Sequence, residues 1–194
     1  MNQARSEQQD LELARRAGEG DERAWREIYD RGCQPLFNFL CYQVGDRDAA
    51  MDILQDTFIT AMKRIDRYRG DGPLQGWLRG IALRKSLDWR RSLARKIRLG
   101  EALRREAEPA QAPAADPRLG SEDAELQRAL AKLSPRQRAA LLLRELEELS
   151  FREVAEALGC REATARVHHH RAREAMRGML GAAALSDELE GVQP

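Results

Sequence analysis

Three consecutive histidines, His168 to His170, could bind a metal ion, because imidazole is a common ligand. Consecutive residues of a helix point about 100° apart, however, so the three side chains cannot converge on one ion. Cys160 is a plausible nearby ligand, but a set of four is not evident. We therefore expect no metal site, and we expect His169 to pack half-buried with a minor effect of pH on its surroundings.

Residues that could act as nucleophiles or general bases are scattered along the chain. It contains no phosphate-binding glycine loop, Gly-x-Ser-x-Gly or His-Glu-x-x-His arrangement. Cys33, Cys41 and Cys160 are an odd number without CxxC spacing, which favours neither a disulfide framework nor a zinc site, and we expect Cys33 and Cys41 in the core. The sequence predicts no catalytic residue, no cofactor and no enzymatic activity.

Residues 150–173 have the dimensions of a helix-turn-helix. Ser150 and Glu153 form a capping box, Gly159 can end the first helix, and Ala155 is small where the helices would cross. The outer face of the second helix is rich in arginine, which can bridge guanine O6 and N7 or bind phosphates. This pattern predicts DNA binding, and the alternative is an αα-hairpin with a solvated face.

The net charge of +1 over 194 residues hides an uneven distribution. Residues 61–105 hold 14 basic and 4 acidic side chains, and residues 161–180 hold 5 and 2. The other blocks are acidic: residues 1–60 hold 7 basic and 12 acidic side chains, and residues 106–160 hold 7 and 11. Two basic blocks between acidic ones indicate two contacts with a polyanion, although solvated helix faces could explain either block alone.

Helical periods dominate the chain, and an aromatic content of 5% is low for a β-sandwich. Asp21 can cap one helix, and Pro35 suits the first turn of a second helix. A third helix, capped by Asp46 or Asp48, carries an apolar stripe that continues to Ile65. No apolar run approaches the ~18 residues of a membrane span, and the start of the chain lacks a signal-peptide segment, so we expect a cytoplasmic protein.

The sequence therefore predicts an all-α protein of two small helical domains joined by a flexible linker. The segment from Glu108 to Gly120, with three prolines and no apolar period, is typical of such a linker. We expect a disordered N-terminus over 1–10, a first domain over 11–95, a linker over 96–121, a second domain over 122–181 and a tail over 182–194.

Two blocks of sequence resemble one known family. LSPRQRAALLLRELEELSFREVAEALGCREATARVHHHRAR, from Leu133 to Arg173, resembles the C-terminal DNA-binding domain of extracytoplasmic-function (ECF) sigma factors. The stretch from Asp48 to Arg91 is similar to their N-terminal domain. The resemblance implies sigma region 2-like and region 4-like domains that bind core RNA polymerase and promoter DNA. It also implies control by an anti-sigma factor.

The resemblance also implies three sets of contact residues. The set for the β′ clamp helices of core polymerase is Asp52, Gln55, Asp56 and Lys63. The set for the downstream (−10) promoter element is Arg67, Tyr68, Arg69, Asp71, Arg79, Arg84, Lys85, Arg90 and Arg91. The set for the upstream (−35) element is Arg161, Thr164, Arg166, Val167, His170, Arg171 and Arg173, while the rest of the second domain would face the β flap.

The chain departs from the family pattern at a few of these positions. Arg84 stands where asparagine is common, and Val167, His168 and His169 replace the usual serine, basic residue and leucine. An unstacked base of the −10 element needs an aromatic face. The spacing of Trp77 favours burial, so Tyr68 is the better candidate for DNA contact.

A helix-turn-helix regulator that is not a sigma factor is the alternative function. That hypothesis leaves residues 48–91 unexplained, and such regulators normally add a ligand-binding or phosphoacceptor domain.

Overall fold

The computed structural model describes residues 2–103 and 121–180, and within these ranges it contains helices and turns but no strand. The expectation of an all-α fold is confirmed. The first range forms α1 Asn2–Gly18, α2 Glu22–Val44, α3 Arg47–Met62, the 3-10 helix η1 Ile65–Arg67 and α4 Leu74–Leu103. The second range forms α5 Ser121–Lys132, α6 Pro135–Glu145, α7 Phe151–Leu158 and α8 Glu162–Leu180.

The start of the chain differs from the expectation of disorder over residues 1–10, because α1 begins at residue 2. Its inner face is buried at Leu13 and Ala17. The Asp10 carboxylate accepts a hydrogen bond of 2.8 Å from the backbone N–H of Leu74, which lies at the start of α4. This bond satisfies one of the four N–H groups that a helix start leaves unpaired, so α1 is fixed to the first domain.

Residues 22–44 form one helix, whereas the sequence predicted two. Pro35 lies inside it and removes one backbone hydrogen bond, a cost of about 3 kcal/mol in a helix interior. Packing offsets that cost. A Cβ at Gly32 would lie 2.8 Å from Gln75 Oε1, so the missing side chain lets α2 approach α4 closely. Asp21 caps this helix as predicted, and Gly45 ends it at a φ of 74°.

The boundaries of α3 and α4 refine the expected ones. Asp46 caps α3 through a 2.9 Å bond from Ala49 N, and the apolar residue Ile65 lies in η1 rather than in a longer α3. The helix α4 extends through residue 103, so residues 96–103 are helical although they were expected in the linker. The rest of that linker up to Gly120, and the expected tail, lie outside the described residues.

The second domain follows the local signals of the sequence closely. Ser134 with Gln137, and Ser150 with Glu153, form the two predicted capping boxes. Gly159 ends α7 in the left-handed conformation, with a φ of 61°. The helices α6, α7 and α8 pack together around a core of residues such as Leu141, Val154, Ala165, Ala172 and Met176.

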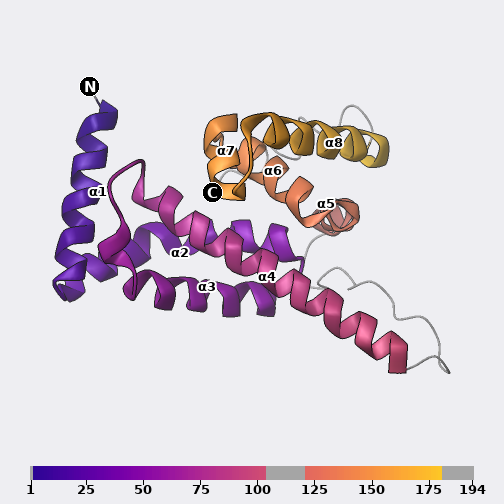
Figure 1. Ribbon diagram of the computed structural model, residues 1–194, viewed down its shortest axis with the longest axis horizontal. Helices are drawn as coiled ribbons and strands as arrows, with labels where there is room; N and C mark the ends of the chain where they lie inside the picture. Colours follow the sequence, from indigo (N-terminus) through magenta and orange to yellow (C-terminus); the bar gives the residue numbers. More distant parts are fainter. Residues whose placement is uncertain (1, 104–120, 181–194) are drawn as a thin grey trace.

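Figure 1 shows how the two domains lie against each other. The helices α5 to α8 lie on one side of α2 and α4, and α3 lies on the other side. Contacts between the domains join α2 to α5, α2 and α4 to α6, and α4 to α7. Among the residues that the structure describes, the outer face of α3 therefore lies away from α5 to α8.

We expect Ser150→Ala to lower the free energy of unfolding of the second domain by about 1 kcal/mol. The Ser150 hydroxyl accepts a hydrogen bond from Glu153 N, and its own N–H is capped by the Glu153 carboxylate. Denaturant unfolding followed by circular dichroism measures the change. Ser150→Thr, which keeps the hydroxyl, is the control, and equal stability of Ser150→Ala and wild type would contradict the role of this cap.

Candidate nucleic-acid and protein interfaces

The outer face of α8, together with Arg161 just before the helix, carries every residue that was expected at the −35 element, and all of them are exposed. They are Arg161, Thr164, Arg166, Val167, His170, Arg171 and Arg173. Arg166 is held by Glu162 at 2.5 Å, and its guanidinium lies 4.5 Å above the centre of the Phe151 ring. Val167 is 46% exposed and provides an apolar contact point between the basic side chains. DNA contact by this set stays a prediction.

His169 was expected to be half-buried and is 7% exposed, so it lies deeper than predicted, and it also has a polar partner. Its Nε2 lies 2.6 Å from Glu145 Oε1, and its ring meets Phe151 edge-on. The hydrogen bond to His169 lowers the pKa of Glu145, and nearby Arg173 acts in the same direction. Burial, with smaller effects from Arg136 and Arg171, lowers the pKa of His168. Within the described residues, no three His, Cys, Asp or Glu side chains are grouped so that they could hold a metal ion.

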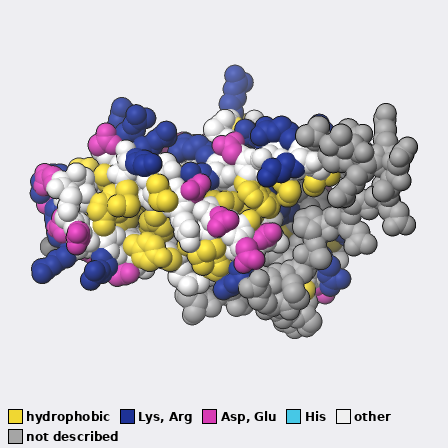
Figure 2. All heavy atoms as spheres, turned by 90° about the horizontal axis from the view of Figure 1, so that it is seen from below, with side chains coloured by type: hydrophobic (Ala, Val, Ile, Leu, Met, Phe, Trp, Pro, Cys, Tyr) yellow, Lys and Arg dark blue, Asp and Glu magenta, His cyan; other side chains and the backbone are white. Residues whose placement is uncertain are grey.

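The outer face of α3 combines acidic, amide and apolar side chains. The four residues expected to bind core polymerase are all exposed there or just beyond: Asp52, Gln55, Asp56 and Lys63. Large apolar side chains are exposed beside them, namely Tyr29, Met51, Ile59 and Met62. Figure 2 views this side and shows hydrophobic side chains gathered among acidic ones. The apolar part of this face was not predicted from the sequence, although Met51, Ile59 and Met62 lie off the buried stripe of α3.

A hollow of about 360 Å³ lies beside the loop between η1 and α4, where the −10 residues were expected. The loop and α4 form one wall, with Arg67, Arg69, Trp77 and Arg84. The other wall belongs to α7 of the second domain, which contributes Leu149, Glu153, Glu156 and Ala157 at or near its ends. The hollow is therefore a feature of both domains.

Two aromatic residues line this hollow, and their exposure is the reverse of what the sequence predicted: Trp77 is more exposed than Tyr68. Tyr68 is only 8% exposed, and its hydroxyl donates a 2.6 Å hydrogen bond to the carbonyl of Gly72. Burial raises the pKa of Tyr68 to about 12. Trp77 is half-buried, lines the hollow and lies 6.0 Å from Tyr68 between ring centres. In this arrangement Tyr68 secures the loop, and Trp77 offers the more accessible aromatic face.

Arg79 and Arg90 of the expected −10 set have partners that lie far from them along the chain. Arg79 forms an ion pair with Glu147 of the second domain. Arg90 donates hydrogen bonds to the carbonyls of Gln43 at 3.1 Å and Val44 at 3.0 Å, at the end of α2. Of the remaining set, Arg67, Arg69, Asp71, Arg84 and Arg91 are exposed and Lys85 is half-buried. Sequence spacing could not reveal these partners, because they are distant along the chain.

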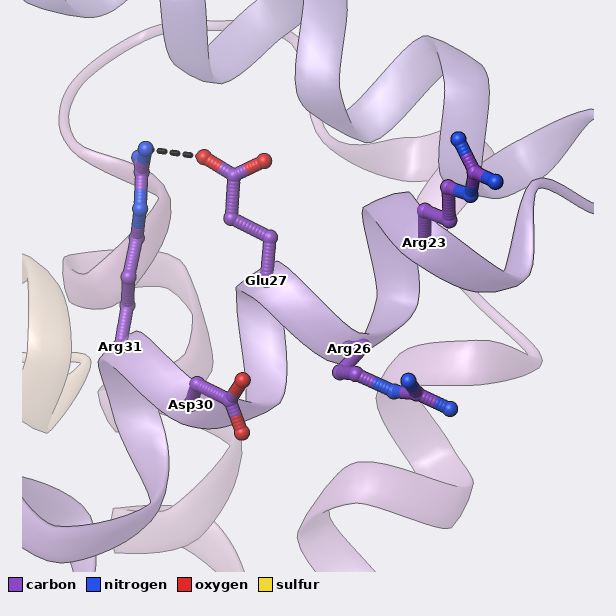
Figure 3. Close-up of a pocket in the computed structure, with 5 residues that line it drawn as sticks. All are labelled: Arg23, Arg26, Glu27, Asp30 and Arg31. Atoms are coloured by element: carbon purple, nitrogen blue, oxygen red, sulfur yellow. Dashed lines mark hydrogen bonds and ion pairs between the residues drawn. The ribbon is translucent and has the colours of Figure 1, made fainter.

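A second hollow lies along α2 and offers no comparable site. Its lining residues all come from one helix: Arg23, Arg26, Glu27, Asp30 and Arg31. Figure 3 shows their side chains spread along that helix, with an ion pair between Arg31 and Glu27. Because no other helix contributes a lining residue, this hollow is an ordinary charged helix surface. None of the described helices has both the length and the apolar character needed to cross a membrane.

Comparison with known proteins identifies both halves of the fold. Residues 28–96 match the family model for Sigma-70 region 2, and residues 123–176 match that for Sigma-70 region 4. The chain is 30% identical to the ECF RNA polymerase sigma-E factor of Escherichia coli over 86% of this chain and 92% of the relative. It is 34% identical to the ECF RNA polymerase sigma factor SigE of Mycolicibacterium smegmatis over 83% of this chain, and it spans 64% of that relative's length.

A solved structure with a similar fold is CnrH in complex with the cytosolic domain of CnrY. Its TM-score is 0.64 and its sequence identity 25%, over 90% of this chain and 98% of that one. The similarity extends across both domains, so the two-domain helical fold is shared.

We expect Glu145→Gln to reduce the loss of stability in acid. A carboxyl whose pKa is lowered by folding stabilises the folded state above its ordinary pKa, and this contribution is lost as the pH falls through the lowered pKa. Glu145 is such a group, with His169 as the main cause. Wild type should therefore lose more free energy of unfolding than Glu145→Gln between about pH 5 and the lowered pKa of Glu145. Urea unfolding at a series of pH values measures this, and parallel pH curves would contradict it.

Proposed function

Because the chain belongs to the ECF group of RNA polymerase sigma factors, we propose that it binds core RNA polymerase and directs the start of transcription at promoters. The observation that carries this proposal is the pairing of two exposed surfaces of different character. The α3 face is acidic and apolar, and the α8 face is basic. One suits a protein partner and the other suits DNA.

The α3 face is proposed to bind the β′ clamp helices of the polymerase. Asp52, Gln55 and Asp56 lie beside the exposed side chains of Ile59 and Met62. An apolar centre with a charged rim is the usual anatomy of a protein interface. Asp56 also lies 3.6 Å from the half-buried Lys85, and because Asp56 itself is exposed this pair costs little to break. The remaining surface of the second domain is proposed to face the β flap.

The DNA contacts divide between the two domains. The loop after η1, with the basic residues of α4, is proposed to bind the −10 element, where Trp77 or Tyr68 can stack on an unpaired base. The outer face of α8 is proposed to enter the major groove of the −35 element. The exposed ion pair of Arg166 with Glu162, and the exposed contact of His170 with Glu174 at 3.6 Å, cost little to exchange for DNA groups. The boundaries 11–95 and 122–181 remain our proposed domain limits.

An anti-sigma factor is proposed to control the protein. CnrH, which has a similar fold, is in complex with the cytosolic domain of CnrY. A regulator that covers the α3 face would compete directly with the polymerase. The polymerase and promoter as partners place the protein in the cytoplasm, and its role needs no catalytic residue of its own.

The double substitution Gln55→Lys with Asp56→Lys tests the polymerase contact. We expect it to raise the Kd for core polymerase at least roughly tenfold, because like charges across an interface cost several kcal/mol. Competition binding against labelled wild-type chain measures the Kd. Asp30→Lys with Gln34→Lys makes the same chemical change on exposed residues of α2 and should have little effect. Unchanged affinity of the α3 variant would refute this contact.

Arg171→Ala tests the −35 contact on α8. A specific arginine contact to a base contributes about 1–3 kcal/mol, so the affinity of the holoenzyme for promoter DNA should fall roughly 5- to 150-fold. The control is Arg177→Ala, which removes an exposed arginine near the end of the same helix. Gel-shift titration at fixed salt measures both. Equal losses in the two variants would indicate general attraction to DNA rather than a specific contact.

A further inference from the structure

The aromatic ring of Phe151, the half-buried first residue of α7, is a meeting point of three helices. Two guanidinium groups lie over this ring: that of Arg166 on α8 at 4.5 Å from the ring centre, and that of Arg144 on α6 at 5.2 Å. The ring of His169 on α8 meets it edge-on, with 5.3 Å between the two centres. One aromatic side chain thus contacts a residue of the expected −35 set, a residue of the core and a residue of the preceding helix.

The turn before α7 fixes the place of this ring. Arg144 donates a 2.9 Å hydrogen bond to the carbonyl of Leu149, and the N–H of Leu149 donates at 3.0 Å to the carbonyl of Leu143. Glu148 has a φ of 51°, a left-handed conformation that residues other than glycine rarely adopt. A turn that is held in this conformation by its hydrogen bonds gives the following residue, Phe151, one defined position.

His169 supports the ring from the side of the core. It is only 7% exposed, and its Nε2 lies 2.6 Å from Glu145 Oε1. The contact with Glu145 restricts rotation of the imidazole, and an edge-on contact between aromatic rings has a preferred geometry. The pair of Glu145 and His169 therefore holds the Phe151 ring in one orientation.

Arg166 uses only one face of its guanidinium in this contact. Its N–H donors lie in the plane of the group, so stacking on a ring leaves them available for other partners. One of them donates to Glu162 at 2.5 Å, and the Arg166 side chain is still 58% exposed. A DNA group can therefore replace the Glu162 carboxylate while the ring stays beneath the guanidinium.

This support distinguishes Arg166 from the other arginines expected at the −35 element. In the part of the chain that the structure describes, Arg166 is the one among them whose guanidinium lies over an aromatic ring. A flexible side chain loses rotamer freedom when it binds, and a side chain that is already ordered loses less. Arg166 is thus ordered before DNA arrives.

We propose that Phe151 is a positioning residue for base recognition, whose ring holds the guanidinium of Arg166 ready to read one base pair in the major groove. This inference rests on the proposed function, because it assumes that α8 enters the −35 element. Arginine most often reads guanine, through two hydrogen bonds to O6 and N7. Two bonds need a fixed plane and direction, which the ring supplies, so Phe151 contributes to sequence choice through Arg166.

The test begins by finding the base pair that Arg166 reads. Holoenzyme made from the full chain and core polymerase selects duplexes from a library that is randomised over the −35 segment. The base pair whose preference disappears with Arg166→Ala is the one in question. Discrimination at this base pair is the Kd for the substituted duplex divided by the Kd for the preferred duplex, from gel-shift titration at fixed salt. A loss of folded protein affects both Kd values equally and leaves this ratio unchanged.

Phe151→Leu removes the ring but keeps an apolar side chain. It should lower discrimination at this base pair roughly 2- to 10-fold, the range expected from losing the order of one flexible side chain. Phe151→Tyr keeps the ring and should discriminate as well as wild type. Combined with Arg166→Ala, Phe151→Leu should cause no further loss, because the two residues act as one unit. Base pairs that depend on Arg171 are the control within the same duplex and should keep their preference.

Nuclear magnetic resonance of the full chain without DNA provides a second measurement. Aromatic rings shift the signals of nuclei that lie over their faces, so the side-chain signals of Arg166 should be displaced in wild type and in Phe151→Tyr. The displacement should disappear in Phe151→Leu. Circular dichroism checks that this variant is folded, and Phe151→Met, whose side chain fills irregular apolar space, replaces it if it is not.

The inference is overturned if removing the ring leaves discrimination at this base pair unchanged, or if it weakens every base preference to the same extent. A further loss in the Arg166→Ala background would also overturn it, because Phe151 would then act on DNA without Arg166. Wild-type holoenzyme that prefers no −35 sequence at all would instead refute the proposed function. The displaced Arg166 signals would in that case still show whether the guanidinium is stacked on the ring.

Discussion

The C-terminal end of α2 is the point on which the arrangement of both domains depends. A helix end carries unpaired carbonyls and partial negative charge, which favours cations. Here Arg90 from the first domain and Arg138 from the second domain both donate to the Gln43 carbonyl. One helix end thus orders the long helix α4 within its own domain and receives α6 from the other domain.

The basic and acidic blocks of the sequence lie on different surfaces of the folded chain. The basic residues of α8 face outward and are available to DNA, whereas those of α4 are divided between solvent and internal partners such as Glu147. The acidic residues of α3 lie on the opposite side of the first domain from α5 to α8. This separation lets one small chain hold a protein partner and a nucleic acid without placing like charges against either.

Local signals could be predicted from the sequence, and contacts between distant residues could not. The capping boxes at Ser134 and Ser150 depend on residues three positions apart, so the sequence alone identifies them. The single α2 helix was missed because Ile28 before Pro35 and Leu36 and Phe39 after it are buried in the core, and this tertiary packing cannot be read from the local effect of a proline. The partner of His169 was missed because Glu145 lies 24 residues away, and no periodicity connects them.

The exposed methionines of α3 have a consequence for how that surface recognises its partners. Met51 and Met62 have unbranched, polarizable side chains with several rotatable bonds, which fit irregular apolar surfaces at small cost in strain. Asp52 and Asp56, which lie between the two methionines in the sequence, favour a partner with positive charge. They do not determine the shape of that partner. A face of this kind can bind partner proteins of different shapes. Because these partners share one binding surface, only one of them can be bound at a time.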